Sequence, residues 1–110
     1  MHILVIDDQK PWCTAIKGLL TPHEHFVDSA LDTAEGFQKL ISRKYDLLLL
    51  DKNVPVEEEC FNQLEKIASL KNSTGAPSHL KSLQIIIFTA YESVKSTIKA
   101  MRLDIYDYLE

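Results

Sequence analysis

The feature that most constrains the fold is an alternation between short continuous apolar runs and longer segments whose apolar residues recur at helical spacing. His2 to Ile6 forms the first such run, and the stretch from Asp46 to Asp51 contains four consecutive leucines. A continuous run of leucine and β-branched residues is typical of a strand buried on both faces of a parallel sheet, since a strand with one solvated face alternates apolar and polar residues. The alternation therefore predicts an α/β fold with helices on both faces of a parallel sheet and right-handed crossovers.

The boundaries of these elements follow from the same pattern. Five strands are expected, at residues 2–6, 25–30, 46–51, 83–88 and 105–109. Four helices are expected. The first runs from Pro11 to Leu20 with the apolar face Trp12, Ile16, Leu19 and Leu20, and the second follows an N-cap at Asp32 or Thr33 with the face Ala34, Phe37, Leu40 and Ile41. The third runs from Glu57 to Lys71 with the face Cys60 or Phe61, Leu64, Ile67 and Ala68, and the fourth lies around Val94, Ile98 and Met101. Residues 72–82 have no periodic apolar set, which predicts a loop.

Length and charge exclude several classes of protein. The chain has 110 residues, which suits one domain with a single core. A net charge of −4, with scattered basic residues, argues against nucleic-acid binding. The apolar runs are far shorter than the ~18 residues of a membrane helix, and the first is not a secretory signal, so we expect no membrane contact and a cytoplasmic location. Cys13 and Cys60 have no metal-ligand spacing and are expected to be buried, reduced thiols.

Acidic and hydroxyl side chains follow the predicted strands at the points where the strands end. Asp7 and Asp8 follow the first strand, Asp51 ends the third and Thr89 follows the fourth. Ligands of such sheets bind outside the carboxyl ends of the strands, and three carboxylates gathered there would repel one another without a cation. Oxygen ligands of this kind favour Mg²⁺. The competing interpretation is structural, because acids often end strands and cap helices, and Asp8 is well placed to cap the first helix.

With these residues in place, the sequence resembles the receiver domain of two-component response regulators, which are CheY-like proteins. Four motifs carry the resemblance across the whole chain: Ile3-Leu4-Val5-Ile6-Asp7-Asp8, Leu47-Leu48-Leu49-Leu50-Asp51-Lys52-Asn53-Val54-Pro55, Ile85-Ile86-Ile87-Phe88-Thr89-Ala90 and Tyr106-Asp107-Tyr108-Leu109. The resemblance implies a three-layer αβα sandwich with a flavodoxin-like, doubly wound parallel sheet of five strands in the order 2-1-3-4-5.

The resemblance also implies a chemical role for each motif. Asp51 would be the phosphoacceptor, taking a phosphoryl group from a sensor histidine kinase or a histidine phosphotransfer protein. Asp7, Asp8, Asp51 and the backbone carbonyl of Asn53 would hold Mg²⁺. Autodephosphorylation would complete a self-catalysed cycle, without making the domain an enzyme in the usual sense.

A conformational switch is the second implication of the resemblance. Thr89 would supply the switch hydroxyl that bonds a phosphoryl oxygen, and Tyr108 the aromatic side chain that responds by changing the surface of the fourth helix and fifth strand. The domain would be joined to an output domain beyond Glu110, and activation through a homodimer is left open.

Three departures from the family pattern qualify these expectations. The family's usual lysine would follow Glu110, where this sequence stops; Val54-Pro55-Val56 lacks the usual glycine; and the loop 72–82 is longer than the usual connection. Five strands with four helices suggest one receiver domain over residues 1–110, cut short at its C-terminus and lacking the fifth helix. The missing lysine and the long loop also support an alternative function, a receiver-like interaction module that binds its partner regardless of phosphorylation. A Mg²⁺-dependent phosphohydrolase is disfavoured, because Asn53 stands where its general acid would be.

Overall fold

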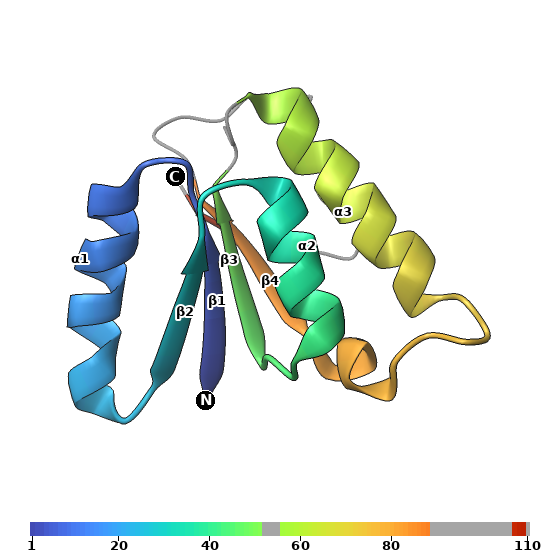
Figure 1. Ribbon diagram of the computed structural model, residues 1–110, viewed down its shortest axis with the longest axis horizontal. Coiled ribbons are helices and arrows are strands. Elements are labelled where there is room, and N and C mark those ends of the chain that lie inside the picture. Colours follow the sequence, from blue (N-terminus) through green and yellow to red (C-terminus); the bar gives the residue numbers. More distant parts are fainter. Residues whose placement is uncertain (52–55, 89–106, 110) are drawn as a thin grey trace.

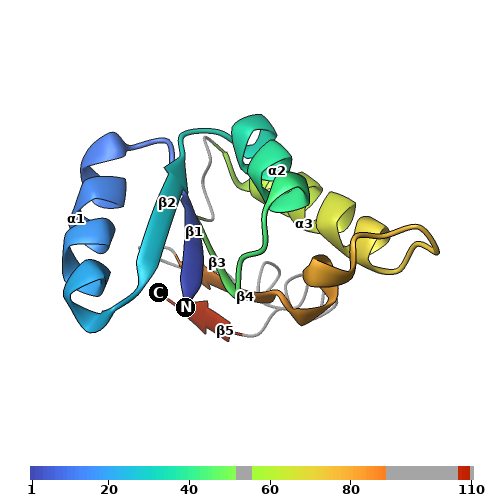
Figure 2. The same ribbon diagram turned by 60° about the horizontal axis from the view of Figure 1, so that its bottom comes forward.

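Five parallel strands form one sheet in the order β2-β1-β3-β4-β5 (Figures 1 and 2). The computed structural model describes residues 1–51, 56–88 and 107–109. The strands are β1 His2–Ile6, β2 Phe26–Ala30, β3 Leu47–Asp51, β4 Gln84–Phe88 and β5 Asp107–Leu109. The predicted strand order is confirmed, and β2, β3 and β4 each begin one residue later than predicted. The helix predicted around Val94 lies outside the described residues.

Helices cover both faces of the sheet, as the alternating pattern predicts. They are α1 Lys10–Leu20, α2 Thr33–Ser42 and α3 Glu57–Lys71, joined by the 3₁₀ turns η1 Thr21–His23 and η2 Ser78–Ser82. Helix α1 packs on one face, whereas α2 and α3 share the other, which gives three layers (Figure 1). No helix among the described residues is long and apolar enough to span a membrane.

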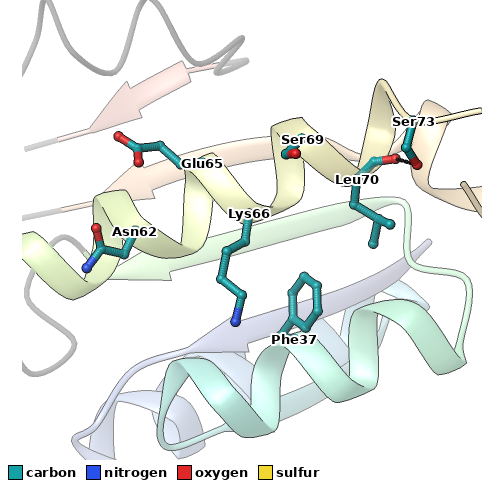
Figure 3. Close-up of a pocket in the computed structure, with 7 residues that line it drawn as sticks. All are labelled: Phe37, Asn62, Glu65, Lys66, Ser69, Leu70 and Ser73. Carbon is teal, nitrogen blue, oxygen red and sulfur yellow. Dashed lines mark hydrogen bonds between the residues drawn. The ribbon is translucent and has the colours of Figure 1, made fainter.

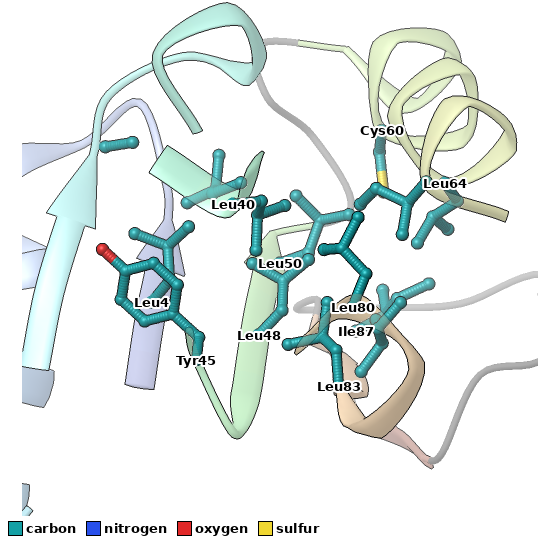
Figure 4. Close-up of a cluster of buried hydrophobic side chains, with 14 of the residues drawn as sticks. Leu4, Leu40, Tyr45, Leu48, Leu50, Cys60, Leu64, Leu80, Leu83 and Ile87 are labelled. Carbon is teal, nitrogen blue, oxygen red and sulfur yellow. The ribbon is translucent and has the colours of Figure 1, made fainter. Parts of the chain in front are cut away.

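Each apolar run supplies side chains to both faces of the sheet. In β1, Ile3 and Val5 belong to a small cluster under α1, whereas Leu4 and Ile6 belong to the larger cluster under α2 and α3 (Figure 4). All four side chains are at most 2% exposed. Burial of one such side chain contributes about 1.5–3 kcal/mol, so the run holds both helical layers onto the sheet.

The close approach of α2 to β1 depends on a glycine. The N-cap of α2 is Asp32, whose Oδ1 accepts a hydrogen bond from the Glu35 backbone N–H at 2.7 Å. One turn into the helix, a Cβ atom on Gly36 would overlap Cδ1 of Ile6. A larger residue at this position would therefore push the helix away from the strand.

The predicted apolar face of α1 is partly wrong. Trp12 is 59% exposed and Leu19 is 71% exposed, while Cys13 is buried and Ile16 and Leu20 pack against the cluster under α1. The sheet covers only the strip of the helix that runs through the latter three residues. Trp12 and Leu19 lie on the flank beyond this strip, so the helix has two overlapping apolar patterns and only one of them faces the sheet. In α2, Ala34 was predicted to be buried and is exposed, whereas Leu40 of the same predicted face is buried.

The segment 72–82 is more ordered than the loop that its sequence predicts. It ends in η2, where Leu80 is buried at 2% exposure, and the Nε2 atom of His79 lies 3.0 Å from the Leu40 carbonyl of α2. A single buried leucine produces no periodicity, which is why the pattern did not reveal this packing.

Candidate functional site

Three carboxylates meet at the carboxyl ends of the two central strands. Strands β1 and β3 are parallel neighbours in which Ile6 is aligned with Leu50. The residues that follow these two positions, Asp7 and Asp51, therefore lie side by side, with Asp8 next to them. One carboxylate oxygen from each of the three aspartates lies within 4.8 Å of the others.

Burial differs strongly among the three aspartates. Asp7 is 1% exposed, Asp51 is partly buried and Asp8 is exposed, so the cluster runs from the protein interior to solvent. The structural interpretation of Asp8 as a helix cap is not what the structure shows, because the N-cap of α1 is Gln9 and it makes no side-chain capping bond. Asp8 is thus left at the open side of the cluster.

Three groups outside the carboxylate cluster form hydrogen bonds with Asp7. Its backbone N–H donates to the Ala30 carbonyl at 3.1 Å, and its Oδ1 accepts from the Gln9 backbone N–H at 2.9 Å. The thiol of Cys13 donates to its carbonyl oxygen at 3.5 Å. Neither the Gln9 contact nor the Cys13 contact was predicted from the sequence, in which Cys13 was expected only to be buried. Asp7 lies two residues before the N-cap Gln9, and an aspartate side chain commonly accepts a hydrogen bond from the backbone N–H two residues later. This pattern signals the Gln9 contact, but nothing in the sequence signals the Cys13 contact.

Burial raises the pKa of Asp7 above its usual value, and the negative charge of Asp8 raises it further. The hydrogen bonds with the Gln9 backbone and with the Asp51 side chain lower this pKa, because they stabilise the ionised form. A positive charge among the three carboxylates would remove the repulsion. Among the described residues the cluster offers carboxylate oxygens, and hard cations such as Mg²⁺ take these ligands, so the residues fit such an ion.

The other predicted site residues are only partly placed. Tyr108 lies in β5, where its backbone is aligned with Ile87 of β4. Thr89 and Asn53 lie outside the described residues, so their predicted roles stay predictions. The backbone of Asp51 is aligned with Phe88, the residue before Thr89 in the sequence.

A second surface feature is a groove between α2 and α3 (Figure 3). Its volume is about 630 Å³, and the residues that line it are Phe37, Asn62, Glu65, Lys66, Ser69, Leu70 and Ser73. The Nζ atom of Lys66 lies 4.7 Å from the centre of the Phe37 ring, a cation–π contact across the groove. None of the three aspartates lines it, so the groove is separate from the carboxylate cluster.

Comparison with known proteins gives one consistent picture. A family described as "Response regulator receiver domain" matches residues 3–110. The sensory transduction protein LytR of Staphylococcus haemolyticus is 32% identical over 111 residues, which cover 99% of this chain and 39% of that protein. The transcriptional regulatory protein ZraR of Escherichia coli O157:H7 is 28% identical over 109 residues. The match covers 99% of this chain but only 22% of ZraR, so the chain spans about a fifth of that relative.

Solved structures agree with these sequence matches. The response regulator TrrA of Thermotoga maritima, crystallised in complex with Mg(2+)-BeF, is 26% identical with a TM-score of 0.77, covering 98% of this chain and 84% of that chain. A CheY-like receiver domain protein of Methanospirillum hungatei has a TM-score of 0.82 at 23% identity, covering 98% and 78% of the two chains, and supports the fold.

Proposed function

We propose a function from one established premise: the chain belongs to the family of response regulator receiver domains of two-component signalling, because that family matches residues 3–110. In this chain, Asp51 accepts a phosphoryl group, and its phosphorylation switches the domain to its signalling state. The observation that carries the proposal is the meeting of three carboxylates at the ends of β1 and β3.

Asp51 is the proposed nucleophile because it combines access with position. It ends β3 beside the deeply buried Asp7, and it is itself only partly buried. A carboxylate nucleophile needs no general base. One of its oxygens attacks the phosphorus of a phosphohistidine, so that an O–P bond forms while the P–N bond breaks. The electron pair of the broken bond leaves on the imidazole nitrogen of the donor.

Asp7 and Asp8 are the proposed metal ligands, together with Asp51 and the Asn53 carbonyl. Mg²⁺ bound here would offset the negative charge of the transferring phosphoryl group. The chain's own contribution is to hold the carboxylates in place. The Gln9 N–H fixes the orientation of the Asp7 carboxylate, and the exposure of Asp8 leaves the cluster open to a donor.

Thr89 and Tyr108 are proposed to pass the signal to the surface. Strand β4 pairs with β3 on one side and with β5 on the other, so it joins the phosphoacceptor strand to the strand that contains Tyr108. A hydroxyl at Thr89 would bond the new phosphoryl oxygen, and a response of Tyr108 would alter the surface around β5.

We further propose that the partners are a sensor histidine kinase or a histidine phosphotransfer protein in the cytoplasm. The chain is then one receiver domain of a longer regulator, with an output domain beyond Glu110. Support for the longer protein comes from relatives such as ZraR and LytR, of which the chain covers only 22% and 39%.

The test is phosphorylation by a small donor. Acetyl phosphate with Mg²⁺ should add one phosphoryl group to the wild-type chain, seen as a mass increase in intact-protein mass spectrometry. Asp51→Asn should remain unmodified, and Asp46→Asn, at a partly buried aspartate that precedes β3 and lies outside the cluster, should react like the wild type. EDTA should abolish the reaction.

Equal modification of the wild type and Asp51→Asn would show that another residue is the acceptor. No modification of either protein, combined with no binding of beryllofluoride, would leave the chain without phosphoacceptor function. It would then fit a module that binds partners regardless of phosphorylation.

A further inference from the structure

The turn after β1 is held at Asp7 by three contacts, and they differ in kind. The contacts with Ala30 and Gln9 use backbone atoms of those residues, so both persist whatever side chain stands there. The contact between the Cys13 sulfur and the Asp7 carbonyl oxygen, at 3.5 Å, uses a side chain. Of these three contacts, the one with Cys13 can therefore be removed by replacing a side chain other than that of Asp7.

Cys13 lies where a weak donor is most effective. It is in the first turn of α1, 4% exposed, in the apolar cluster that contains Ile3, Val5 and Val27. A thiol is a weak donor, and water would outcompete it at an exposed position. Here both partners are buried, since Asp7 is 1% exposed, and no competing donor to this carbonyl is found among the described residues. The cluster thus holds the sulfur against the turn that presents the carboxylate.

We propose that Cys13 is a positioning residue for Asp7: its thiol fixes the Asp7 carbonyl and so the backbone from which the carboxylate reaches the cluster. This inference rests on the proposed function, because its consequence concerns the same three carboxylates. If the carbonyl loses its donor, the turn keeps its contacts with Ala30 and Gln9 but has a wider range of backbone angles. The Asp7 carboxylate then spends less time in the arrangement in which one oxygen of each aspartate lies within 4.8 Å of the others.

The experiment compares four variants of the whole chain. Cys13→Ala removes the donor, Cys13→Ser keeps a hydroxyl donor, and Cys13→Val fills the space without a donor. Val27→Ala truncates the same apolar cluster without touching the turn. Mg²⁺ binding is followed by the fluorescence of Trp12, the single tryptophan, whose backbone N–H bonds to Gln9. The carbonyl-carbon NMR shift of Asp7 is measured without metal.

Loss of the thiol should weaken Mg²⁺ binding by about two- to fivefold, the size expected from one weak hydrogen bond. The Asp7 carbonyl shift should move in both Cys13→Ala and Cys13→Val, return toward the wild-type value in Cys13→Ser, and stay unchanged in Val27→Ala. Because Cys13→Val preserves the packing, the contact can be tested even if Cys13→Ala folds poorly.

Two results would overturn the inference. One is an Asp7 carbonyl shift that is the same in the wild type and Cys13→Val. The other is a loss of Mg²⁺ affinity in Val27→Ala as large as in Cys13→Ala, which would reduce the role of Cys13 to packing. If the wild type itself binds no Mg²⁺, the proposed function fails, while the metal-free carbonyl shift still decides whether the thiol holds Asp7.

Discussion

Replacing Asp7 by asparagine should make the metal-free protein more stable. One carboxylate oxygen of each of the three aspartates lies within 4.8 Å of the others. At that separation two unit charges repel by about 3.5 kcal/mol at an effective dielectric constant of ~20 and by about 0.9 kcal/mol in water. Asp7 is buried beside an exposed and a partly buried aspartate, so its repulsion lies between these limits. Allowing for the hydrogen bond from Gln9, we expect the free energy of unfolding to rise by roughly 1–3 kcal/mol.

The pH dependence of this effect has a definite sign. The pKa of Asp7 is higher in the folded protein than in the unfolded chain, chiefly because of burial. Between the two pKa values the folded state keeps a proton that the unfolded state has released, so stability falls as the pH rises through this interval. The advantage of Asp7→Asn should therefore be absent in acid, where Asp7 is protonated in both states, and largest at neutral pH.

Thermal unfolding in EDTA at several pH values is the assay, since 1 kcal/mol shifts Tm by roughly 4–8 °C in a domain of this size. Asp46→Asn is the matched control. The Asp46 carboxylate accepts a hydrogen bond from the His2 backbone N–H, which lowers its pKa, so the same substitution there should not stabilise the protein. Added Mg²⁺ should stabilise the wild type, by about 2.7 kcal/mol at one hundred times Kd, and should stabilise Asp7→Asn less. An Asp7→Asn protein that is no more stable than the wild type in EDTA at pH 7 would refute the reasoning.

Three further predictions concern the packing and the switch. Gly36→Ala should lower the free energy of unfolding by about 1–3 kcal/mol because the added methyl group has no room. Gly18→Ala, in open space on α1, should raise the free energy of unfolding by about 1 kcal/mol. Urea unfolding of both variants measures the two effects, and equal effects would contradict the prediction. Tyr45→Phe removes the 2.8 Å hydrogen bond to Asp28 and should cost about 1 kcal/mol. Burial raises the Tyr45 pKa to about 12, so the wild type should lose stability between its unfolded value near 10 and pH 12, and a Tyr45→Phe protein with the same alkaline loss would exclude this cause. Thr89→Ala should still accept a phosphoryl group but show smaller amide NMR shifts in β5 on adding beryllofluoride, and unaltered shifts would argue against the proposed switch.

The strand ends were predictable because two simple rules act together. A continuous apolar run must be buried, so the first polar residue after it marks the end of the strand. Parallel pairing then aligns the ends of neighbouring strands, as Ile6 and Leu50 are aligned here. The positions of Asp7 and Asp51 follow from these rules without any knowledge of side-chain contacts.

The helix faces and the supports of the site were less predictable, for a different reason. In α1, Trp12 and Leu19 formed a plausible apolar strip with Ile16, but the sheet covers a neighbouring strip. Which strip is covered depends on how the helix is rotated against the sheet, and hydrophobic spacing alone does not determine that rotation. Cys13 was expected to be buried and is, yet its contact with the Asp7 carbonyl depends on the same rotation.

The site and the stability of the fold are therefore coupled through one buried carboxylate. Asp7 is 1% exposed and has two acidic neighbours, an arrangement that costs stability when no cation is present. Nothing in the packing of β1 requires an acid there, since the preceding residues already fill both apolar clusters. A cation that binds the three carboxylates would turn this cost into a gain, because it binds the folded chain and not the unfolded one. Metal binding should thus tighten the same turn that Gln9 and Cys13 hold, and the gain in stability on adding Mg²⁺ measures how well the folded chain binds the ion.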